Sequence, residues 1–196
     1  MSTEQSLTDQ EISSLCAREL LKSKRFCILD TETTGLGRTA EICQLAVIDH
    51  EGKTLIDTLI EPTVKIEPGA TAIHGITKAH VEGKGGFDQH LIPLLQAVRD
   101  KDVVIYNASF DLKLLQQSAR PYGIWLSFPI SDRDGCLVFT NGGNIHCAMH
   151  WYSQWIGEWN DYYGNYKWQP LPGGDHTALG DCLATLEVIK RMASES

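Results

Sequence analysis

Short apolar runs separated by turn signals are the feature that most constrains the fold of this chain. Phe26–Leu29 and Val103–Tyr106 have the length and composition of buried strands. Glu51-Gly52 predicts a hairpin turn between two further strands. The remaining expected elements are strands at 42–48 and 53–60, a Pro- and Gly-bearing loop at 61–86, and helices at about 88–99, 109–120 and 176–192. A hairpin followed by strand, helix and strand predicts an α/β fold, with a mixed sheet and helices on both faces.

The N-terminal segment predicts an amphipathic helix from Thr8 to about Ser23. Thr8 and Glu11 have the spacing of a capping box at its start. The expected apolar face comprises Ile12, Leu15, Cys16 and Leu20. We therefore expect two regions: the helix in residues 1–24, and one domain in residues 25–196 with an aromatic-rich insertion at about 140–170.

Composition excludes several classes of protein. The chain has 196 residues, of which 42% are hydrophobic, enough for one domain with a full core. It has no apolar stretch long enough for a membrane span and no secretory signal pattern. None of its six cysteines forms a Cys-x-x-Cys pair. We expect reduced thiols in a cytoplasmic protein. The spacing of Cys136, His146, Cys147 and His150 fits no standard zinc finger.

Acidic residues follow the predicted strands and occupy the predicted helix starts. Asp30 and Glu32 are two residues apart, so an extended backbone places them on one face. Asp111 falls in the first turn of a helix for which Ser109 is the expected N-cap. Asp181 lies five residues after His176; on one helix the two are about 140° apart and flank a site. Each residue alone also has a purely structural interpretation. Converging carboxylates raise one another's pKa, and hard divalent cations relieve that repulsion.

The order of these residues resembles a known family. Asp30-Thr-Glu-Thr-Thr-Gly35, Asn107-Ala-Ser-Phe-Asp111 and the spacing of His176 and Asp181 are similar to the three motifs of the DEDD exonucleases of the histidine subgroup. The likeness runs from about Arg25 to Arg191 and is greatest to the proofreading-subunit type of bacterial replicative polymerases. A His74-Gly-Ile-Thr77 loop also matches that type.

The resemblance implies a ribonuclease H-like fold with a five-stranded mixed sheet. It implies a 3′→5′ exonuclease that releases nucleoside 5′-monophosphates. Two Mg²⁺ or Mn²⁺ would be held by Asp30, Glu32, Asp111 and Asp181, with His176 as general base. The implied substrate contacts are Thr33, Leu36, His74, Asn107 and Phe110.

Residues 146–168 depart from the family pattern because they are long and rich in tryptophan and tyrosine. Trp151, Trp155, Trp159 and Trp168 lie near i, i+4, i+8 spacing, which is typical of a core face. A surface that stacks on nucleic-acid bases is the alternative interpretation. We expect this segment to affect substrate choice rather than chemistry.

The net charge of −8 predicts weak electrostatic capture of long nucleic acid. This suits an enzyme that grips a few terminal nucleotides, and the resemblance implies that the partner is a 3′ end, preferably single-stranded, with DNA favoured. An RNA-trimming enzyme on the same fold and a catalytically idle module that binds nucleic-acid ends are the alternatives. The sequence leaves open whether the chain forms a homodimer, and we expect no polymerase-binding tail.

Overall fold

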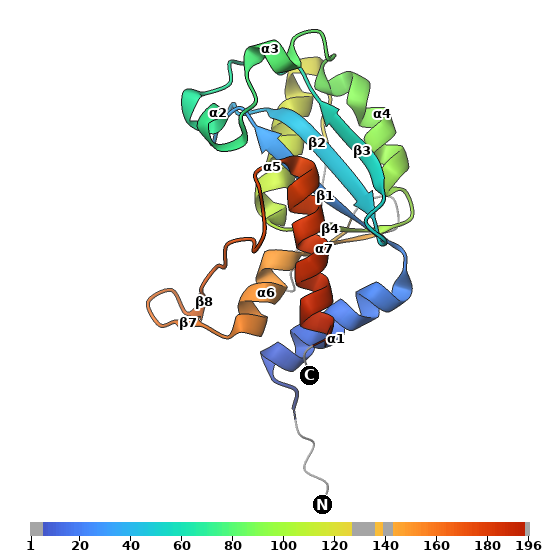
Figure 1. Ribbon diagram of the computed structural model, residues 1–196, viewed down its shortest axis with the longest axis vertical. Helices are drawn as coiled ribbons and strands as arrows, with labels where there is room; N and C mark the ends of the chain where they lie inside the picture. Colours follow the sequence, from blue (N-terminus) through green and yellow to red (C-terminus); the bar gives the residue numbers. More distant parts are fainter. Residues whose placement is uncertain (1–5, 127–135, 139–142, 195–196) are drawn as a thin grey trace, which may run out of the picture.

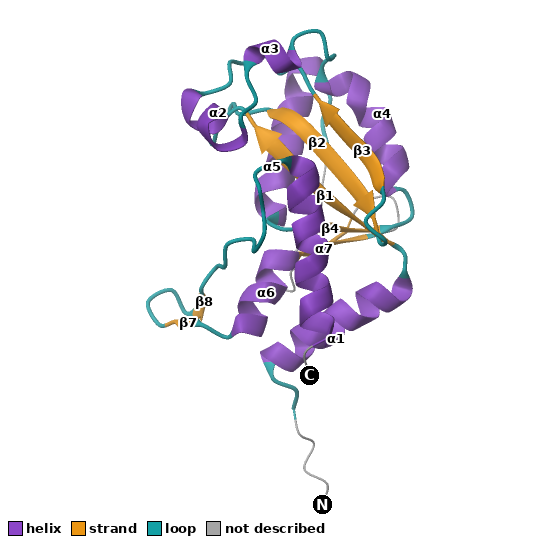
Figure 2. Ribbon diagram, viewed as in Figure 1, coloured by secondary structure: helices purple, strands orange, loops and turns teal. Residues whose placement is uncertain are grey.

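The computed structural model describes residues 6–126, 136–138 and 143–194. Its main sheet has six strands in the order β3-β2-β1-β4-β6-β5 (Figures 1 and 2). The strands are β1 (Phe26–Thr33), β2 (Ile42–Asp49), β3 (Thr54–Leu59), β4 (Asp102–Ile105), β5 (Cys136–Val138) and β6 (Asn144–Cys147). The helices are α1 (Asp9–Ser23), α2 (Pro68–His74), α3 (Lys78–Val81), α4 (Phe87–Val98), α5 (Ala108–Ala119), the short 3₁₀ helix η1 (Arg120–Tyr122), α6 (Ala148–Ile156) and α7 (Ala178–Ser194). Two short strands, β7 (Trp159–Asn160) and β8 (Asn165–Tyr166), form a separate hairpin.

The sheet is mixed, as the sequence predicts. β1 pairs antiparallel with β2 and parallel with β4, and β4 pairs parallel with β6. β5 extends the expected five strands by a sixth, because its three residues pair antiparallel with β6. The α/β fold class is thus confirmed.

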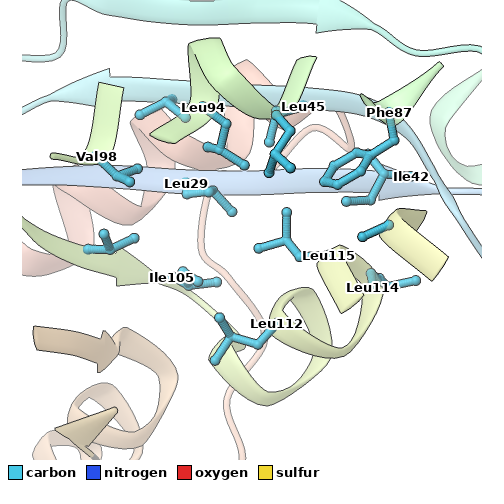
Figure 3. Packing of buried hydrophobic residues seen from close by; sticks show 14 of the residues in the cluster. Leu29, Ile42, Leu45, Phe87, Leu94, Val98, Ile105, Leu112, Leu114 and Leu115 are labelled. Atoms are coloured by element: carbon cyan, nitrogen blue, oxygen red, sulfur yellow. The ribbon is translucent and has the colours of Figure 1, made fainter. Parts of the chain in front are cut away.

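Helices cover both faces of the sheet, and the alternation of side chains along β1 explains why. Cys27 and Leu29 point into a core formed with α4 and α5 (Figure 3). Phe26 and Ile28 point into a second core, formed with α1, α6 and α7. Burying a large aliphatic or aromatic side chain contributes roughly 1.5–3 kcal/mol. Both faces of β1 therefore stabilise the position of the strand that carries Asp30.

The capping box of α1 is confirmed, but the expected apolar face is confirmed only at Leu20 and is wrong at Ile12 and Leu15. The Thr8 hydroxyl accepts the Glu11 N–H at 3.2 Å, and the Glu11 carboxylate accepts the Thr8 N–H at 2.8 Å. Ile12 and Leu15 are exposed, whereas Ser13, Ser14, Ala17 and Leu20 are buried. Small side chains let α1 lie close to α6 and α7, so shape decides this interface more than hydrophobic periodicity does.

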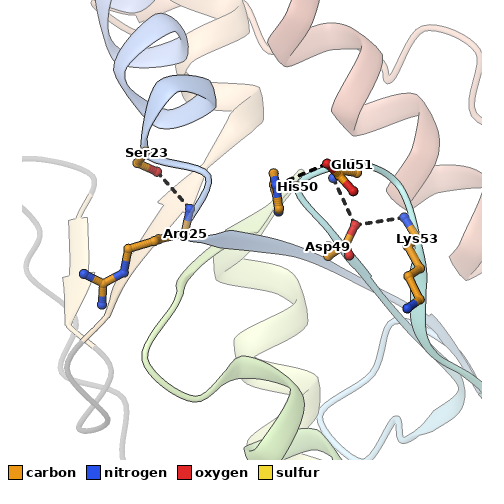
Figure 4. Close-up of polar contacts among 6 residues, drawn as sticks. All are labelled: Ser23, Arg25, Asp49, His50, Glu51 and Lys53. Atoms are coloured by element: carbon orange, nitrogen blue, oxygen red, sulfur yellow. Dashed lines mark hydrogen bonds and ion pairs between the residues drawn. The ribbon is translucent and has the colours of Figure 1, made fainter.

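The connections differ from the expectation in one place. The predicted turn between β2 and β3 is present: one Asp49 carboxylate oxygen accepts the N–H groups of Glu51 and Lys53, each at 2.9 Å (Figure 4). The segment 61–86, expected as a loop, contains the short helices α2 and α3. Among the helices that the structure describes, none combines the length and apolar character needed to cross a membrane.

Candidate active site

Three carboxylates meet on the α7 face of the sheet. β1 continues through Thr33, beyond its expected end, because Thr31 and Glu32 keep pairing with β2. Asp30 and Glu32 therefore stay on one face, as predicted, and Asp181 meets them from the first turn of α7. One oxygen of each of these three residues lies within 4.8 Å of the others. This is a donor set of hard oxygens, which suits a divalent cation such as Mg²⁺ or Mn²⁺.

Asp111 approaches this group from the opposite face of the sheet. It is buried in the first turn of α5, where its carboxylate accepts a 2.7 Å hydrogen bond from the Thr31 hydroxyl. The parallel register ends with Ile28 opposite Val104, so β1 runs past the end of β4 at Asp30. The gap beyond β4 lets Asp111 reach the edge of the acidic group.

The electrostatics show that these acids are close enough to repel one another. Burial, followed by the charges of Asp111, Asp181 and Glu32, raises the pKa of Asp30 well above its usual range. Burial, then Asp181, Asp111 and Asp175, raises the pKa of Glu32 to about 8. Burial raises the pKa of Asp111 to about 7, although the hydrogen bond from Thr31 opposes this. The group therefore retains protons at neutral pH unless cations replace them.

His176 lies outside the helix in which the sequence placed it. α7 begins at Ala178, and His176 has a left-handed backbone with φ of 61°. The expected angle of about 140° between His176 and Asp181 on one helix is therefore wrong. The cause is local capping: the Asp175 carboxylate accepts the Thr177 N–H at 3.0 Å, and the Thr177 hydroxyl accepts the Gly180 N–H at 3.0 Å.

Asp181 nevertheless stays beside His176. One of its carboxylate oxygens accepts the N–H groups of Asp175 at 3.0 Å and His176 at 3.3 Å. The exposed His176 side chain is thus placed by a short loop that the carboxylate itself holds. A non-glycine residue at positive φ needs such support, because the conformation costs about 1 kcal/mol or more.

Two residues that support the site were not singled out from the sequence. The Thr31 hydroxyl donates to Asp111. In the sequence Thr31 stands between the two acids of β1, so a strand points it to the opposite face, and this position could have identified it. Gln44 lies opposite Glu32 on β2, accepts the Ala178 N–H at 3.2 Å and donates to Asp57 at 3.2 Å. Gln44 is the one amide side chain in the largely apolar strand Ile42–Asp49, and this could have identified it from the sequence. Gln44 thereby ties the start of α7 to the sheet.

Three of the expected substrate contacts lie together at the end of β1. His74 Nδ1 accepts the Ile76 N–H at 3.0 Å, so its Nε2 carries the proton and donates to the Thr33 carbonyl at 3.0 Å. The buried Thr33 hydroxyl donates to the Gly35 carbonyl at 2.8 Å. Leu36 is 78% exposed in the loop that follows. An exposed leucine in the loop that follows the acid-bearing strand is available to contact a ligand.

The other two expected contacts lie at the start of α5. Asn107, not Ser109, is the N-cap of this helix, so the expected cap is wrong. The Ser109 hydroxyl instead donates to the Asn107 side-chain oxygen at 3.2 Å. Phe110 is half-buried and packs on the core under α4 and α5.

A zinc site formed by Cys136, His146, Cys147 and His150 would need the Cys136 side chain, which lies outside the described residues. Within the described part of the chain, Asp30, Glu32 and Asp181 are the residues grouped closely enough to hold a metal.

Comparison with known proteins gives consistent matches. The family model described as Exonuclease (RNase_T) matches residues 27–189. The chain is 36% identical to the uncharacterized exonuclease CP81 of Escherichia phage 186, over 96% of this chain and 97% of that protein. Exodeoxyribonuclease 10 of Escherichia coli K12 is 38% identical over 46% of this chain and 40% of its own length.

The fold also matches solved structures. Exonuclease X in complex with 5′ overhanging duplex DNA is 27% identical, with a TM-score of 0.53, over 87% of this chain and 94% of that chain. Escherichia coli exonuclease I with a dT13 oligonucleotide has a TM-score of 0.59 at 20% identity, over 87% of this chain and 41% of that one. The second likeness concerns the fold alone.

Proposed function

The chain belongs to the exonuclease family, and from this premise we propose that it removes nucleotides from the 3′ end of single-stranded DNA with the five residues at its candidate site. Enzymes of this family hydrolyse phosphodiester bonds and generally depend on divalent metals. The observation that carries the proposal is the meeting of Asp30, Glu32 and Asp181 within 4.8 Å, with Asp111 beside them. Four carboxylates, contributed by β1, α5 and α7, are therefore gathered in one group.

The residues have separate roles in this proposal. Asp30, Glu32, Asp111 and Asp181 hold two Mg²⁺ or Mn²⁺, directly or through water. When bound, such a pair lowers the pKa of an attacking water and stabilises the leaving 3′-oxygen. His176 accepts the proton of that water, which an exposed imidazole next to Asp181 can do. The products are nucleoside 5′-monophosphates.

The end of the substrate is proposed to lie between two groups of contacts. Leu36 and the Thr33–His74 pair flank the acids on one side. Asn107 and Phe110 flank them on the other side, at the start of α5. A terminal nucleotide bound between them would have its scissile phosphate facing the carboxylates.

A digestion panel tests the proposal. Single- and double-stranded DNA and RNA, labelled separately at the 5′ and 3′ ends, are incubated with Mg²⁺ or Mn²⁺. We expect a 3′ label to leave as a mononucleotide and a 5′ label to remain on progressively shorter strands. The Asp30→Asn variant serves as the control for contaminating nucleases.

Each alternative gives a different result. Preferential digestion of RNA would overturn the DNA assignment and favour an RNA-trimming enzyme. Oligonucleotide binding without any product at any Mn²⁺ concentration would favour the idle binding module. Release of the 5′ label first would overturn the proposed direction.

A further inference from the structure

The aromatic segment divides into a buried part and an exposed part. Tyr152 and Trp155 on α6 are buried in the core under α1 and α7, which confirms the core interpretation for this part. α6 ends at Ile156, and Gly157 turns the chain with φ of 77°. After this turn the chain is no longer helical, so the spacing of the tryptophans no longer predicts a shared face. The chain instead forms the β7–β8 hairpin, which extends from the body of the protein (Figure 1).

Four aromatic side chains in and directly after this hairpin face solvent. Their exposed fractions are 51% for Trp159, 86% for Tyr162, 71% for Tyr163 and 63% for Trp168. A two-stranded hairpin has no core of its own in which to bury them. Four large aromatic residues exposed within ten positions indicate a binding surface.

The hairpin has a defined conformation that keeps these rings in place. Trp159 and Tyr166 pack edge to face with ring centroids 5.1 Å apart. The Tyr166 hydroxyl donates to Asp9 on α1 at 2.7 Å. At the tip, the Asn160 side chain accepts the N–H groups of Tyr162 and Tyr163 at 3.1 and 3.3 Å. The rings are thus displayed by a braced turn, which lowers the entropic cost of binding a ligand.

The hairpin leads directly into the candidate active site. The residue after Trp168 is Gln169, whose carbonyl accepts the Tyr106 hydroxyl at 2.8 Å. Tyr106 follows β4 and precedes Asn107. From Trp168 to Asp175 the chain spans seven residues, at most about 25 Å when extended. The connecting loop runs from β8 to the start of α7 (Figure 1). The chain that carries the exposed rings therefore continues into the loop that Asp181 holds beside His176.

The charge of the hairpin indicates what it binds. Residues 158–168 carry two acids, Glu158 and Asp161, and one base, Lys167, which pairs with Glu158 at 3.5 Å. A surface with this charge does not attract phosphates. Aromatic faces stack on bases of any sequence, and only unpaired bases have faces free to stack.

We propose that Trp159, Tyr162, Tyr163 and Trp168 form a stacking surface for unpaired bases of the substrate strand, on the 5′ side of the nucleotide being removed. This inference rests on the proposed function, because it places the substrate strand over the hairpin. In this proposal, stacking holds long strands, because the acidic protein does not attract them electrostatically. It also makes a single-stranded 3′ region the preferred substrate.

The test replaces Tyr163 and Trp168 with alanine, singly and together, because Trp159 also braces the hairpin through Tyr166. Trp125, 83% exposed after η1 and outside the hairpin, provides the matched control Trp125→Ala. For a single-stranded 20-nucleotide DNA, we expect KM to rise about tenfold for each hairpin variant. Trp168→Phe should retain most of the affinity. The small substrate thymidine 5′-(p-nitrophenyl phosphate) should be hydrolysed at an unchanged rate, because it does not reach the hairpin.

Two results would overturn the inference. A parallel loss on both substrates would mean that the hairpin positions the His176 loop instead of binding DNA. No change on either substrate would mean that the strand takes another path. Fluorescence anisotropy of the same oligonucleotide, measured with the substitutions placed in an Asp30→Asn background, separates this inference from the proposed reaction. Binding that depends on the hairpin without nucleotide release by the wild type would contradict the reaction alone, whereas digestion unaffected by the hairpin variants would contradict the inference alone.

Discussion

Replacing Thr31 with valine tests how the protein prepares Asp111 for metal. Valine keeps the shape and β-branching of threonine but removes the hydroxyl that donates to Asp111 at 2.7 Å. The strand should remain intact, because Thr31 is paired through its backbone with Leu45 on β2. The variant therefore changes one hydrogen bond to a buried carboxylate.

The size of the effect follows from that bond. A hydrogen bond to a charged group contributes about 1.5–3 kcal/mol, and about 1.4 kcal/mol changes an equilibrium constant tenfold. The Asp111 pKa of about 7 already includes the favourable bond from Thr31. Without that bond, protonation of Asp111 should become about ten- to a hundredfold more favourable. A cation that binds Asp111 has to displace this proton.

Titration calorimetry with Mn²⁺ at two pH values measures the consequence. At about pH 6, the Kd of Thr31→Val should exceed that of the wild type by about ten- to a hundredfold. At about pH 9, where Asp111 is ionised in the wild type and at least half ionised in the variant, the difference should shrink to about twofold or less. Thr31→Ser, which keeps the hydroxyl, is the matched control. Equal affinities at the lower pH would refute the reasoning, and an equal loss at both values would mean that the valine displaces Asp111 instead.

Three further outcomes are expected. Asp30→Asn should abolish nuclease activity while leaving the metal-free melting temperature unchanged or higher, because it removes one of the repelling charges; activity within about twofold of wild type would refute the metal-site assignment. His176→Ala should lower kcat by about 10²–10⁴ with Mn²⁺ binding retained in calorimetry, and an equally large loss of metal affinity would make His176 a ligand. Without metal, the folded protein should lose stability as pH rises from about 4 to about 8: Asp111 and Glu32 have folded-state pKa values of about 7 and 8, above those of the unfolded chain, so the folded state holds more protons in that window. Thermal denaturation in EDTA should show this decline and saturating Mn²⁺ should remove it; a metal-free stability that rises across the window would contradict the assigned pKa shifts.

The sequence alone determined the α/β class and the acids on β1. Runs such as Phe26–Leu29 have one stable environment, between two layers of helices, and the period of two in a strand places Asp30 and Glu32 on one face. Motif order also predicted that Asp111 and Asp181 lie near them. The fold class and the shared face of Asp30 and Glu32 depend on local pattern, which a sequence displays directly.

The tertiary structure decided how the acids meet and what surrounds them. Asp111 comes from the far face of the sheet because β4 ends before β1 does, and no local pattern encodes that difference in length. The position of His176 has a local cause instead: it leaves the helix because its sequence neighbours Asp175, Thr177 and Asp181 bond the nearby backbone N–H groups, which helical periodicity does not show.

The fate of the tryptophans was likewise decided by packing. Trp155 and Trp159 have the same residue type and fit one helical repeat, yet α6 ends between them, so the first is buried and the second is exposed. A periodic pattern reports which side chains would share a face if the helix continued. The helix ends at Gly157, whose left-handed backbone stops it. The burial of Trp155 depends instead on contacts with α1 and α7, which lie far away in the sequence and come together only in the folded chain.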